Sequence, residues 1–208
     1  MNPWEEINLS DYENHMKLES VYQLQTLNKM MWGQLNDYDV SSVLILGVAG
    51  GNGLNHVDRD RINVIYGVDI NEDYLKICKE RYPVLEDLFV PIRADITNEF
   101  CELPKADIVI ADLFVEYVGC EIFASTIRKI KPKYVSVIIQ VNEDDGFVSD
   151  SPYMTELKKL EKVHFCIDEK EISLSMKKID YNLSYRTEEN LPNGKKLIRL
   201  DYCFNLKD

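Results

Sequence analysis

Val43-Leu-Ile-Leu-Gly-Val-Ala-Gly-Gly-Asn-Gly-Leu54 is the stretch of sequence that decides the fold. Its first four residues form a short apolar run of the kind that makes a buried parallel strand. Four glycines follow within the next seven residues. They allow the backbone to turn sharply and a ligand to lie against bare peptide. The stretch therefore predicts a strand that ends in a ligand-binding loop, at the carboxyl edge of a parallel sheet.

The next apolar run, residues 62–69, ends in an acid, Asp69. A carboxylate that follows the second strand of such a sheet is placed to accept hydrogen bonds from the two hydroxyls of a ribose. Asp69 also has a structural interpretation as a helix N-cap, because Asn-Glu-Asp at 71–73 opens the next helical segment. The glycine loop and Asp69 together predict a cofactor that carries a nucleoside.

Charge and composition exclude several classes of partner. The 208 residues include 24 basic and 36 acidic side chains, a formal net charge of −12. This charge repels a polyanion, so we expect no nucleic-acid partner. The longest apolar stretches have the length of strands, so we expect no membrane span. The first 20 residues are acidic and polar, unlike a signal peptide, and the five cysteines are widely spaced, which favours reduced thiols in a cytoplasmic protein.

Strand-like and helical patterns alternate from residue 41 onward. We expect strands at 42–47, 63–69, 88–93, 106–112 and 134–141, and helices near 52–58, 71–81, 115–130 and 152–162. This alternation is typical of βαβ units and a parallel sheet. The tail differs, because 180–187 and 195–205 are two strand-like runs joined through Pro-Asn-Gly at 192–194. That turn predicts an antiparallel C-terminal hairpin.

Residues 1–40 are predicted to form a helical N-terminal extension, ahead of a main domain at 41–208. Apolar side chains recur there at helical spacing, so one face of the extension packs on something. They are Leu18, Val21, Leu24, Leu27, Met31 and Leu35.

The glycine loop does not fit the dinucleotide fingerprint G-x-G-x-x-G, whether it is read from Gly47 or from Gly51. It instead resembles the G-x-G-x-G loop of the class I S-adenosylmethionine-dependent methyltransferases, read here as Gly47-Val-Ala-Gly-Gly51. Ala49 replaces the middle glycine. Ile45 stands where that family often has an acid that contacts the amino-acid end of the cofactor. The resemblance covers residues 40–206 and implies S-adenosylmethionine as the cofactor.

The same resemblance implies a fold and a set of cofactor contacts. The fold is an α/β, Rossmann-like, seven-stranded and mostly parallel sheet with an antiparallel C-terminal hairpin and helices on both faces. Asp69 then binds the ribose, Asp95 the adenine amine, and Asp112, after the fourth strand, lies beside the transferable methyl group. The cofactor-binding residues implied are Gly47, Val48, Ala49, Gly51, Asn52, Asp69, Ile70, Asp95, Ile96 and Asp112.

Asp112 is not followed by Pro-Pro-Tyr, so the signature for methylation of amino groups on nucleic-acid bases or glutamine is missing. We therefore predict a small-molecule acceptor. Asp112 and His15 are the candidate catalytic residues, and Tyr12, His15 and Tyr117 are the candidate substrate contacts, with the N-terminal extension as a lid. For His15 and Tyr117, a role in packing is the alternative. No metal site is predicted.

Three other interpretations stay open. An aminopropyltransferase would use a similar loop but carries an N-terminal β-hairpin domain. A metal-assisted O-methyltransferase would need oxygen ligands, which Asp112, Gln140 and Asn142 supply in part. A non-catalytic protein would keep the cofactor site without turnover. The acidic loop at 142–146 either attracts a cationic amine or is simply solvated. The sequence does not identify the acceptor or the oligomeric state.

Overall fold

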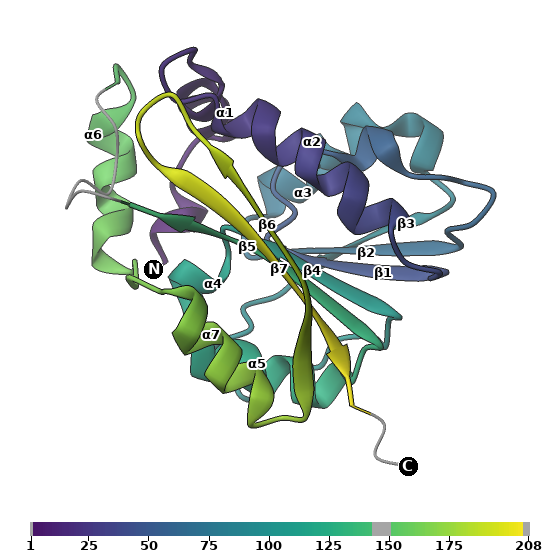
Figure 1. Ribbon diagram of the computed structural model, residues 1–208. Helices are drawn as coiled ribbons and strands as arrows, with labels where there is room; N and C mark the ends of the chain where they lie inside the picture. The colour runs from purple at the N-terminus through teal and green to yellow at the C-terminus, as the bar shows by residue number, and fades with distance from the viewer. Residues whose placement is uncertain (1, 143–150, 206–208) are drawn as a thin grey trace.

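Seven strands form one sheet in the order β3-β2-β1-β4-β5-β7-β6 (Figure 1). The computed structural model describes residues 2–142 and 151–205. Strands β1 to β5 pair in parallel, whereas β7 lies antiparallel between β5 and β6. The predicted fold, with its C-terminal hairpin, is confirmed. The strands are β1 (Ser42–Leu46), β2 (Val64–Asp69), β3 (Phe89–Arg93), β4 (Ile108–Asp112), β5 (Tyr134–Val141), β6 (Tyr181–Asn190) and β7 (Lys196–Phe204).

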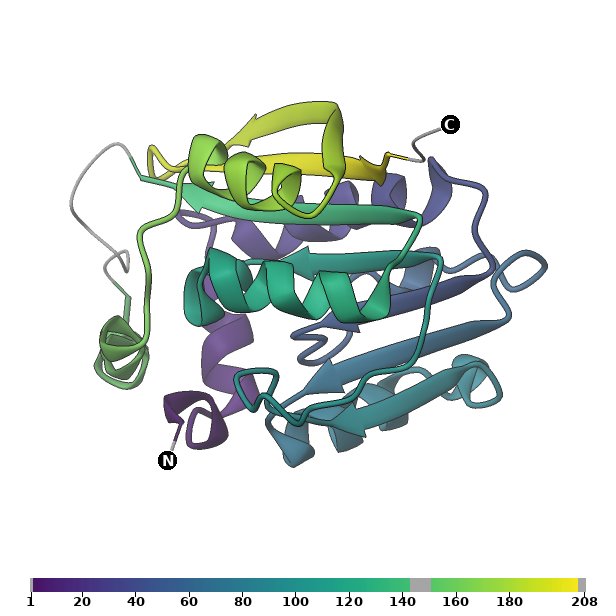
Figure 2. The same cartoon turned by 90° about the horizontal axis from the view of Figure 1, so that it is seen from below.

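Helices cover both faces of the sheet (Figure 2). Helices α2 and α3 pack on one face, and α5 and α7 pack on the other. None of the described helices is both long enough and apolar enough to cross a membrane. The α-helices are α1 (Leu9–Lys17), α2 (Gln23–Asn36), α3 (Glu72–Arg81), α4 (Val115–Val118), α5 (Cys120–Ile130), α6 (Met154–Leu157) and α7 (Glu169–Lys177). The 3-10 helices are η1 (Pro3–Glu5), η2 (Leu54–His56), η3 (Pro83–Leu85) and η4 (Lys158–Lys162).

The apolar run of β1 is buried on both sides, because successive side chains of a strand point to opposite faces. Val43 and Ile45 belong to the core under α2 and α3. Leu44 and Leu46 belong to the core under α5 and α7. The central strand is thus anchored on both faces, which fixes the position of the glycine loop at its end.

The helix expected near 52–58 is wrong, because this segment holds only the three-residue η2. The reason is the conformation of the loop: Gly53 has a φ of +94°, outside the range of a helix. A Cβ on Gly53 would stand 2.7 Å from Met31 of α2. Helix α2, from the N-terminal segment, covers this part of the sheet instead, with Met31 and Leu35 in the core beside Val43.

Two other predicted helices are interrupted, and one was missed. The helix expected at 115–130 breaks at Gly119, whose φ and ψ of 78° and 157° separate α4 from α5. The helix expected at 152–162 is a short α6 followed by the 3-10 helix η4. Helix α7 was not predicted, although Asp168 caps it by accepting a hydrogen bond from the Glu171 amide. The acidic loop at 142–146 lies, after Asn142, outside the described residues.

Candidate active site

The glycine loop leaves β1 with its backbone tied to β2. The amides of Gly47 and Val48 donate to the carbonyl of Val68 at 2.9 and 3.1 Å. Gly47 has a φ of +70°, and a Cβ there would stand 2.7 Å from the ring of Phe114. Ala49 adopts a left-handed φ of +46°. The loop therefore presents a tight, fixed backbone at the carboxyl end of the central strand.

Asp69 holds this loop against the start of α3. Its Oδ2 accepts from the Ala49 amide and its Oδ1 from the Asn71 amide, both at 2.9 Å. Asn71, and not Asp69, is the N-cap of α3, so the helix-cap interpretation of Asp69 is wrong. Burial raises the pKa of Asp69, and the backbone amides that bind it oppose this shift. Each carboxylate oxygen has room for a second donor, such as a ligand hydroxyl.

A pocket next to Asp69 encloses about 700 Å³ of space, part of it open to solvent. We call it the Asp69 pocket. On its floor, Asp95 is exposed and its Oδ1 accepts from the amide and the hydroxyl of Thr97. Seven of the predicted cofactor residues thus meet around one space. Of the predicted residues, those that line it are Gly47, Ala49, Asp69, Ile70, Asp95, Ile96, Asp112, Tyr12 and Tyr117.

A second space, the glycine-loop pocket, adjoins the first and is lined by the segment 47–50, Asn52, Asp112 and Glu13. Ile45 also lies there and carries no charge. The carboxylate of Glu13, on α1, instead reaches the loop, so close to Gly50 that a Cβ there would collide with it. Strand β1 contains no acid, and the carboxylate that lies beside the loop comes from α1.

Gly51 and Asn52 lie in the loop but face the helices. A Cβ on Gly51 would stand 2.7 Å from the sulfur of Cys78 on α3, and Gly51 lines neither of the two pockets. Asn52 lines the glycine-loop pocket, while its side chain donates to the carbonyl of Leu24 and accepts from Asn28. Both residues therefore fasten the loop onto α2 and α3, and ligand contacts from them stay a prediction.

Asp112 ends β4 and lines both pockets. Its Oδ1 accepts a hydrogen bond from the amide nitrogen of Gln34, on α2, at 2.7 Å. Burial raises the pKa of Asp112, and the Gln34 hydrogen bond and the charge of Arg199 lower it. The net pKa is about 7. Gln34 is fully buried, yet the sequence analysis did not single it out. The sequence does contain a sign of this role, because Gln34 is a polar residue next to Met31 and Leu35 on the apolar face of α2.

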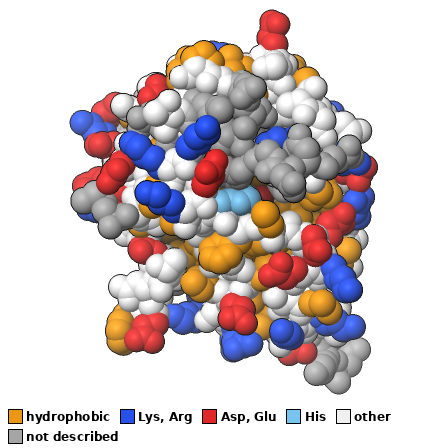
Figure 3. All heavy atoms as spheres, turned by 90° about the vertical axis from the view of Figure 1, so that its left-hand side faces the viewer, with side chains coloured by type: hydrophobic (Ala, Val, Ile, Leu, Met, Phe, Trp, Pro, Cys, Tyr) orange, Lys and Arg blue, Asp and Glu red, His pale blue; other side chains and the backbone are white. Residues whose placement is uncertain are grey.

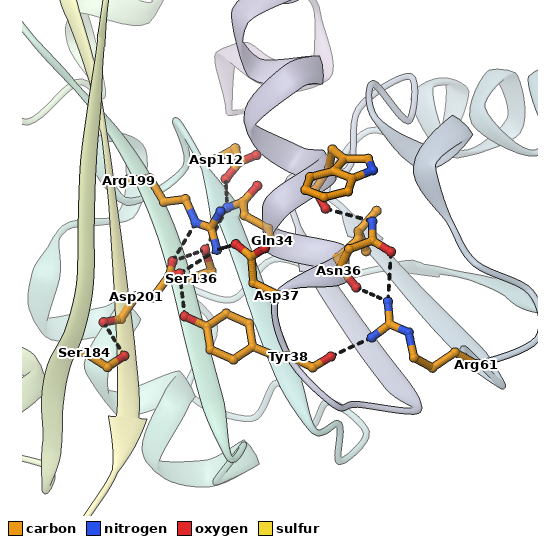
Figure 4. A network of polar contacts seen from close by, with 12 residues as sticks. Gln34, Asn36, Asp37, Tyr38, Arg61, Asp112, Ser136, Ser184, Arg199 and Asp201 are labelled. Atoms are coloured by element: carbon orange, nitrogen blue, oxygen red, sulfur yellow. Dashed lines mark hydrogen bonds and ion pairs between the residues drawn. The ribbon is translucent and has the colours of Figure 1, made fainter.

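Gln34 connects Asp112 to a buried charge network on β5 and β7 (Figure 4). Its amide also donates to Ser136 at 3.0 Å, and the Ser136 hydroxyl donates to Asp201. Asp201 forms a two-point ion pair with Arg199, at 3.0 and 2.6 Å. The Tyr38 hydroxyl donates to Asp201 at 2.6 Å. One end of this network is Asp112, so the network holds that carboxylate in place.

A third space, the Glu116 pocket, lies between α1, α4 and the hairpin turn of β6 and β7. All three predicted acceptor contacts line it: Tyr12, His15 and Tyr117. The other lining residues are Met16, Val21, Gln23, Leu113, Glu116, Gln140, Leu157, Leu160, His164, Asn193 and Lys195. Figure 3 faces this side of the molecule and shows a histidine side chain among acidic, basic and hydrophobic ones.

His15 is buried, and its Nδ1 lies 2.8 Å from the hydroxyl of Ser151. Burial lowers the pKa of His15 and of His164, and the positive charge of Lys195 lowers both further. Both imidazoles are therefore neutral near pH 7. Among the described residues, no group of three His, Cys, Asp or Glu side chains is arranged to hold a metal ion.

Aromatic rings lie where the pockets adjoin. Tyr12 lines all three of them, and Tyr117 lines the Asp69 and Glu116 pockets. The ring of Trp4, in η1, packs edge-on against both, with centroid distances of 5.1 Å to Tyr12 and 4.9 Å to Tyr117. Trp4 was not predicted, because no periodic pattern or motif surrounds it. Tyr12 and Tyr117 thus lie where the Asp69 pocket and the Glu116 pocket adjoin, and Trp4 supports both rings from the side of the Asp69 pocket.

No family model and no curated protein matches the sequence. Solved structures do match. The N-methyltransferase NodS from Bradyrhizobium japonicum WM9, in complex with S-adenosyl-L-homocysteine, is 11% identical, with a TM-score of 0.67 over 100% of both chains. Magnesium protoporphyrin IX methyltransferase from Synechocystis PCC 6803 is 13% identical, with a TM-score of 0.59 over 88% of this chain and 83% of the other. The cyclopropane synthase MmaA2 from Mycobacterium tuberculosis is 9% identical, with a TM-score of 0.64 over 91% and 88%.

The fold of the chain is therefore that of the class I S-adenosylmethionine-dependent methyltransferases, as the glycine loop indicated. At these identities the likeness concerns the fold.

Proposed function

We propose that this protein is an S-adenosylmethionine-dependent methyltransferase that acts on a small molecule. The observation that carries the proposal is Asp69, a buried carboxylate tied by Ala49 and Asn71 to the wall of a pocket that Asp95 also lines. These carboxylate acceptors fit an adenosyl group, with the ribose hydroxyls at Asp69 and the adenine between Asp95 and Ile96. When bound, the cofactor supplies a methyl group already activated on a sulfonium.

The glycine-loop pocket fits the amino-acid end of the same cofactor. Its wall combines the bare backbone of residues 47–50 with the carboxylates of Glu13 and Asp112. A carboxylate is a suitable acceptor for the ammonium group of an amino acid, and Asp112 supplies one, whereas Glu13 is already paired with the guanidinium of Arg81. Asp112 lines both pockets, so it lies where the two ends of the cofactor meet.

The N-terminal segment acts as a lid in this proposal. It is held over the carboxyl edge of the sheet by the carbonyls of Trp4 and Ile7, which accept from Asn71 at 2.9 Å and from Tyr74 at 2.8 Å. Tyr12 follows on α1 and lines every pocket. Such a cover excludes water from the reacting atoms and completes the acceptor site.

The aminopropyltransferase interpretation requires an N-terminal β-hairpin domain, and residues 2–40 contain η1, α1 and α2 and no strand. Helices there support the methyltransferase proposal over that alternative. A non-catalytic cofactor-binding protein would have the same pockets. Turnover alone separates it from an enzyme.

Calorimetry with S-adenosylmethionine, S-adenosylhomocysteine and NAD tests the proposal. We expect micromolar binding of both adenosyl ligands and no heat with NAD. Binding of NAD without either adenosyl ligand would refute it. Incubation with S-adenosylmethionine and a pool of small acceptors, followed by mass spectrometry for a gain of one methyl group, then distinguishes an enzyme from a binding protein.

A further inference from the structure

Glu116 is a buried carboxylate with an incomplete set of partners. It lies on α4, is 3% exposed, and lines the Glu116 pocket. Its Oε1 accepts from the Gln140 amide at 2.8 Å, whereas its Oε2 has no hydrogen-bond partner within the described part of the chain. A buried carboxylate oxygen without a donor is costly, so a proton or a ligand cation is needed to complete the site.

The position of this carboxylate is fixed. The backbone carbonyl of Glu116 accepts from the Phe165 amide at 2.7 Å, and the preceding Val115 is fully buried in the core. The Gln140 amide, which holds Oε1, belongs to β5. Glu116 is therefore held by α4, by β5 and by the segment before α7, so its carboxylate cannot turn away to solvent.

The charges around Glu116 favour a cation. Burial and, to a smaller extent, the negative charge of Asp112 raise the pKa of Glu116, the Gln140 amide lowers it, and the net pKa is about 7. No cation of the described residues is among the groups that shift it. The phenols of Tyr12 and Tyr117 have raised pKa values and stay neutral at pH 7.

The other titratable groups of the pocket are His15, His164 and Lys195. Both histidines are neutral near pH 7, because burial and the charge of Lys195 lower their pKa. Lys195 adds a positive charge to the lining of the pocket, and this charge lowers the pKa of both histidines. The pocket thus has an acidic side at Glu116 and a basic side at Lys195.

We propose that the Glu116 pocket binds the methyl acceptor, that this acceptor is a small primary or secondary amine, and that Oε2 of Glu116 binds its nitrogen. The inference rests on the proposed methyltransferase function. A carboxylate binds an ammonium group by charge-assisted hydrogen bonds, and the rings of Tyr12 and Tyr117 beside it attract a cation as well. An acceptor that is already an anion would be repelled by Glu116 and Asp112.

Glu116 also takes part in the proton balance. The acceptor nitrogen must lose a proton before its lone pair is free to take the methyl group, and Oε2 accepts that proton. A neutral secondary amine loses its proton only after it gains the methyl group, again to the same oxygen. Each turnover thus adds one methyl group and removes one proton, which Glu116 passes to solvent. A base with a pKa near the working pH is well suited to this role.

The test uses the full-length protein saturated with S-adenosylhomocysteine, whose binding is measured first. A panel of small primary and secondary amines, each with and without a carboxylate, is then titrated by calorimetry. Alcohols, phenols, thiols and carboxylic acids of the same size form the comparison set. We expect heat from amines and none from the comparison set. Binding of members of the comparison set alone would overturn the inference.

The Glu116→Gln variant removes the charge while keeping an acceptor for the Gln140 amide. Glu121, which is exposed at the start of the next helix, α5, gives the matched control Glu121→Gln. We expect Glu116→Gln to bind S-adenosylhomocysteine normally, to bind the amine at least tenfold more weakly, and to lose at least a hundredfold in kcat. The control should match the unmodified protein. Equal amine binding in both variants would refute the role of Glu116.

A second measurement needs no variant. Amine titrations of the unmodified protein in buffers of different ionisation enthalpy report how many protons binding releases. Near pH 6, where Glu116 carries a proton, binding of an ammonium should release one proton, and at pH 8.5 this release should vanish. No proton release at either pH would contradict the inference. Loss of S-adenosylhomocysteine binding itself would instead refute the proposed function, so the two failures are distinguishable.

Discussion

The guanidinium of Arg81, at the end of α3, forms a two-point ion pair with the carboxylate of Glu13 on α1, with N–O distances of 2.6 and 3.0 Å. It also donates to the carbonyl of Gly50, at 2.9 Å. One side chain thus joins the N-terminal helix, the glycine loop and α3. The pair is partly exposed, so its contribution to stability is about 0.2–1 kcal/mol.

We expect Arg81→Met to loosen α1 without unfolding the protein, because the substitution keeps the apolar stem and removes the charge. Hydrogen exchange of the α1 amides should become up to about fivefold faster, the factor that 1 kcal/mol allows. The affinity for S-adenosylhomocysteine should fall with it. Lys79→Met, on the exposed side of the same helix, is the control. Unchanged exchange in α1 would show that the ion pair does not fasten the N-terminal segment.

Asp69→Ala should weaken binding of S-adenosylhomocysteine by about 2–3 kcal/mol, because two charge-assisted hydrogen bonds to the ribose are lost. The thermal midpoint should also fall slightly, because Ala49 and Asn71 lose their acceptor. Asp73→Ala changes an exposed side chain on α3 and serves as the control in calorimetry and in thermal unfolding. If Asp69→Ala lowered stability yet bound the ligand normally, Asp69 would be a loop support only.

Two buried carboxyl groups contribute stability that should fall as the pH rises, whereas the lowered pKa values of His15 and His164 act in the opposite direction. Burial raises the pKa of Asp112 and of Glu116 to about 7, so between about pH 4 and pH 7 the folded protein binds protons that the unfolded chain does not. That stabilisation is present at low pH and is lost as the pH rises through 7. Glu116→Gln should remove about 3 kcal/mol of this dependence, since its pKa rises from 4.5 to about 7.

Thermal unfolding of this variant and of Glu121→Gln between pH 5 and pH 8.5 measures the effect. Glu116→Gln should be more stable than the control at pH 8.5 and equal to it at pH 5. A constant difference across the range would mean that the Glu116 carboxyl titrates normally.

Gly33→Ala should destabilise the protein, although alanine is the better helix former by about 1 kcal/mol. Gly33 lies in the last turn of α2, and a Cβ there would collide with the guanidinium of Arg199. Arg199 would have to move, and the loss of its buried ion pair with Asp201 should cost about 3–5 kcal/mol, although Asp201 keeps the hydrogen bonds from Ser136 and Tyr38. Urea unfolding checks the sign. A gain in stability would show that Arg199 moves aside freely.

Local patterns were sufficient to predict the strands, whereas the seven-stranded arrangement was implied by the family resemblance and the strand order was not predicted. Each of the strands β1 to β5 is a short apolar run between polar segments, and the turn at 192–194 marks the C-terminal hairpin. The helix expected near 52–58 was wrong because its place on the sheet is taken by α2, which comes from residues far away in the sequence. The periodicity of residues 52–58 cannot show that another helix, α2, covers the same part of the sheet.

The same distinction applies to the site. Asp69 and Asp112 each end a strand of a parallel sheet and Asp95 follows one, so the three lie at the edge where such ends meet, and the family resemblance implied the roles of Asp95 and Asp112. The roles of Gln34 and Glu13 could not be predicted, because each acts through a partner more than 30 positions away, Asp112 for one and Gly50 for the other. The sequence of a helix does not predict which distant loop or strand its polar side chains will contact.

The placement of β7 also constrains how the chain folds as it is synthesised. Arg199 and Asp201, on the last strand, contact Asp37 and Tyr38, near the end of the first sheet-covering helix. On a ribosome, which makes the N-terminus first, α2 must wait for almost the whole chain before its buried polar face finds these partners. Before β7 is made, Tyr38 lacks Asp201, and the Ser136 hydroxyl that binds Gln34 lacks the same carboxylate. The edge of β5 is also unpaired, because β7 is the strand that pairs with it. We therefore expect the nascent chain to reach its cooperative native state only on release, and truncation at the C-terminus to loosen the N-terminal helices.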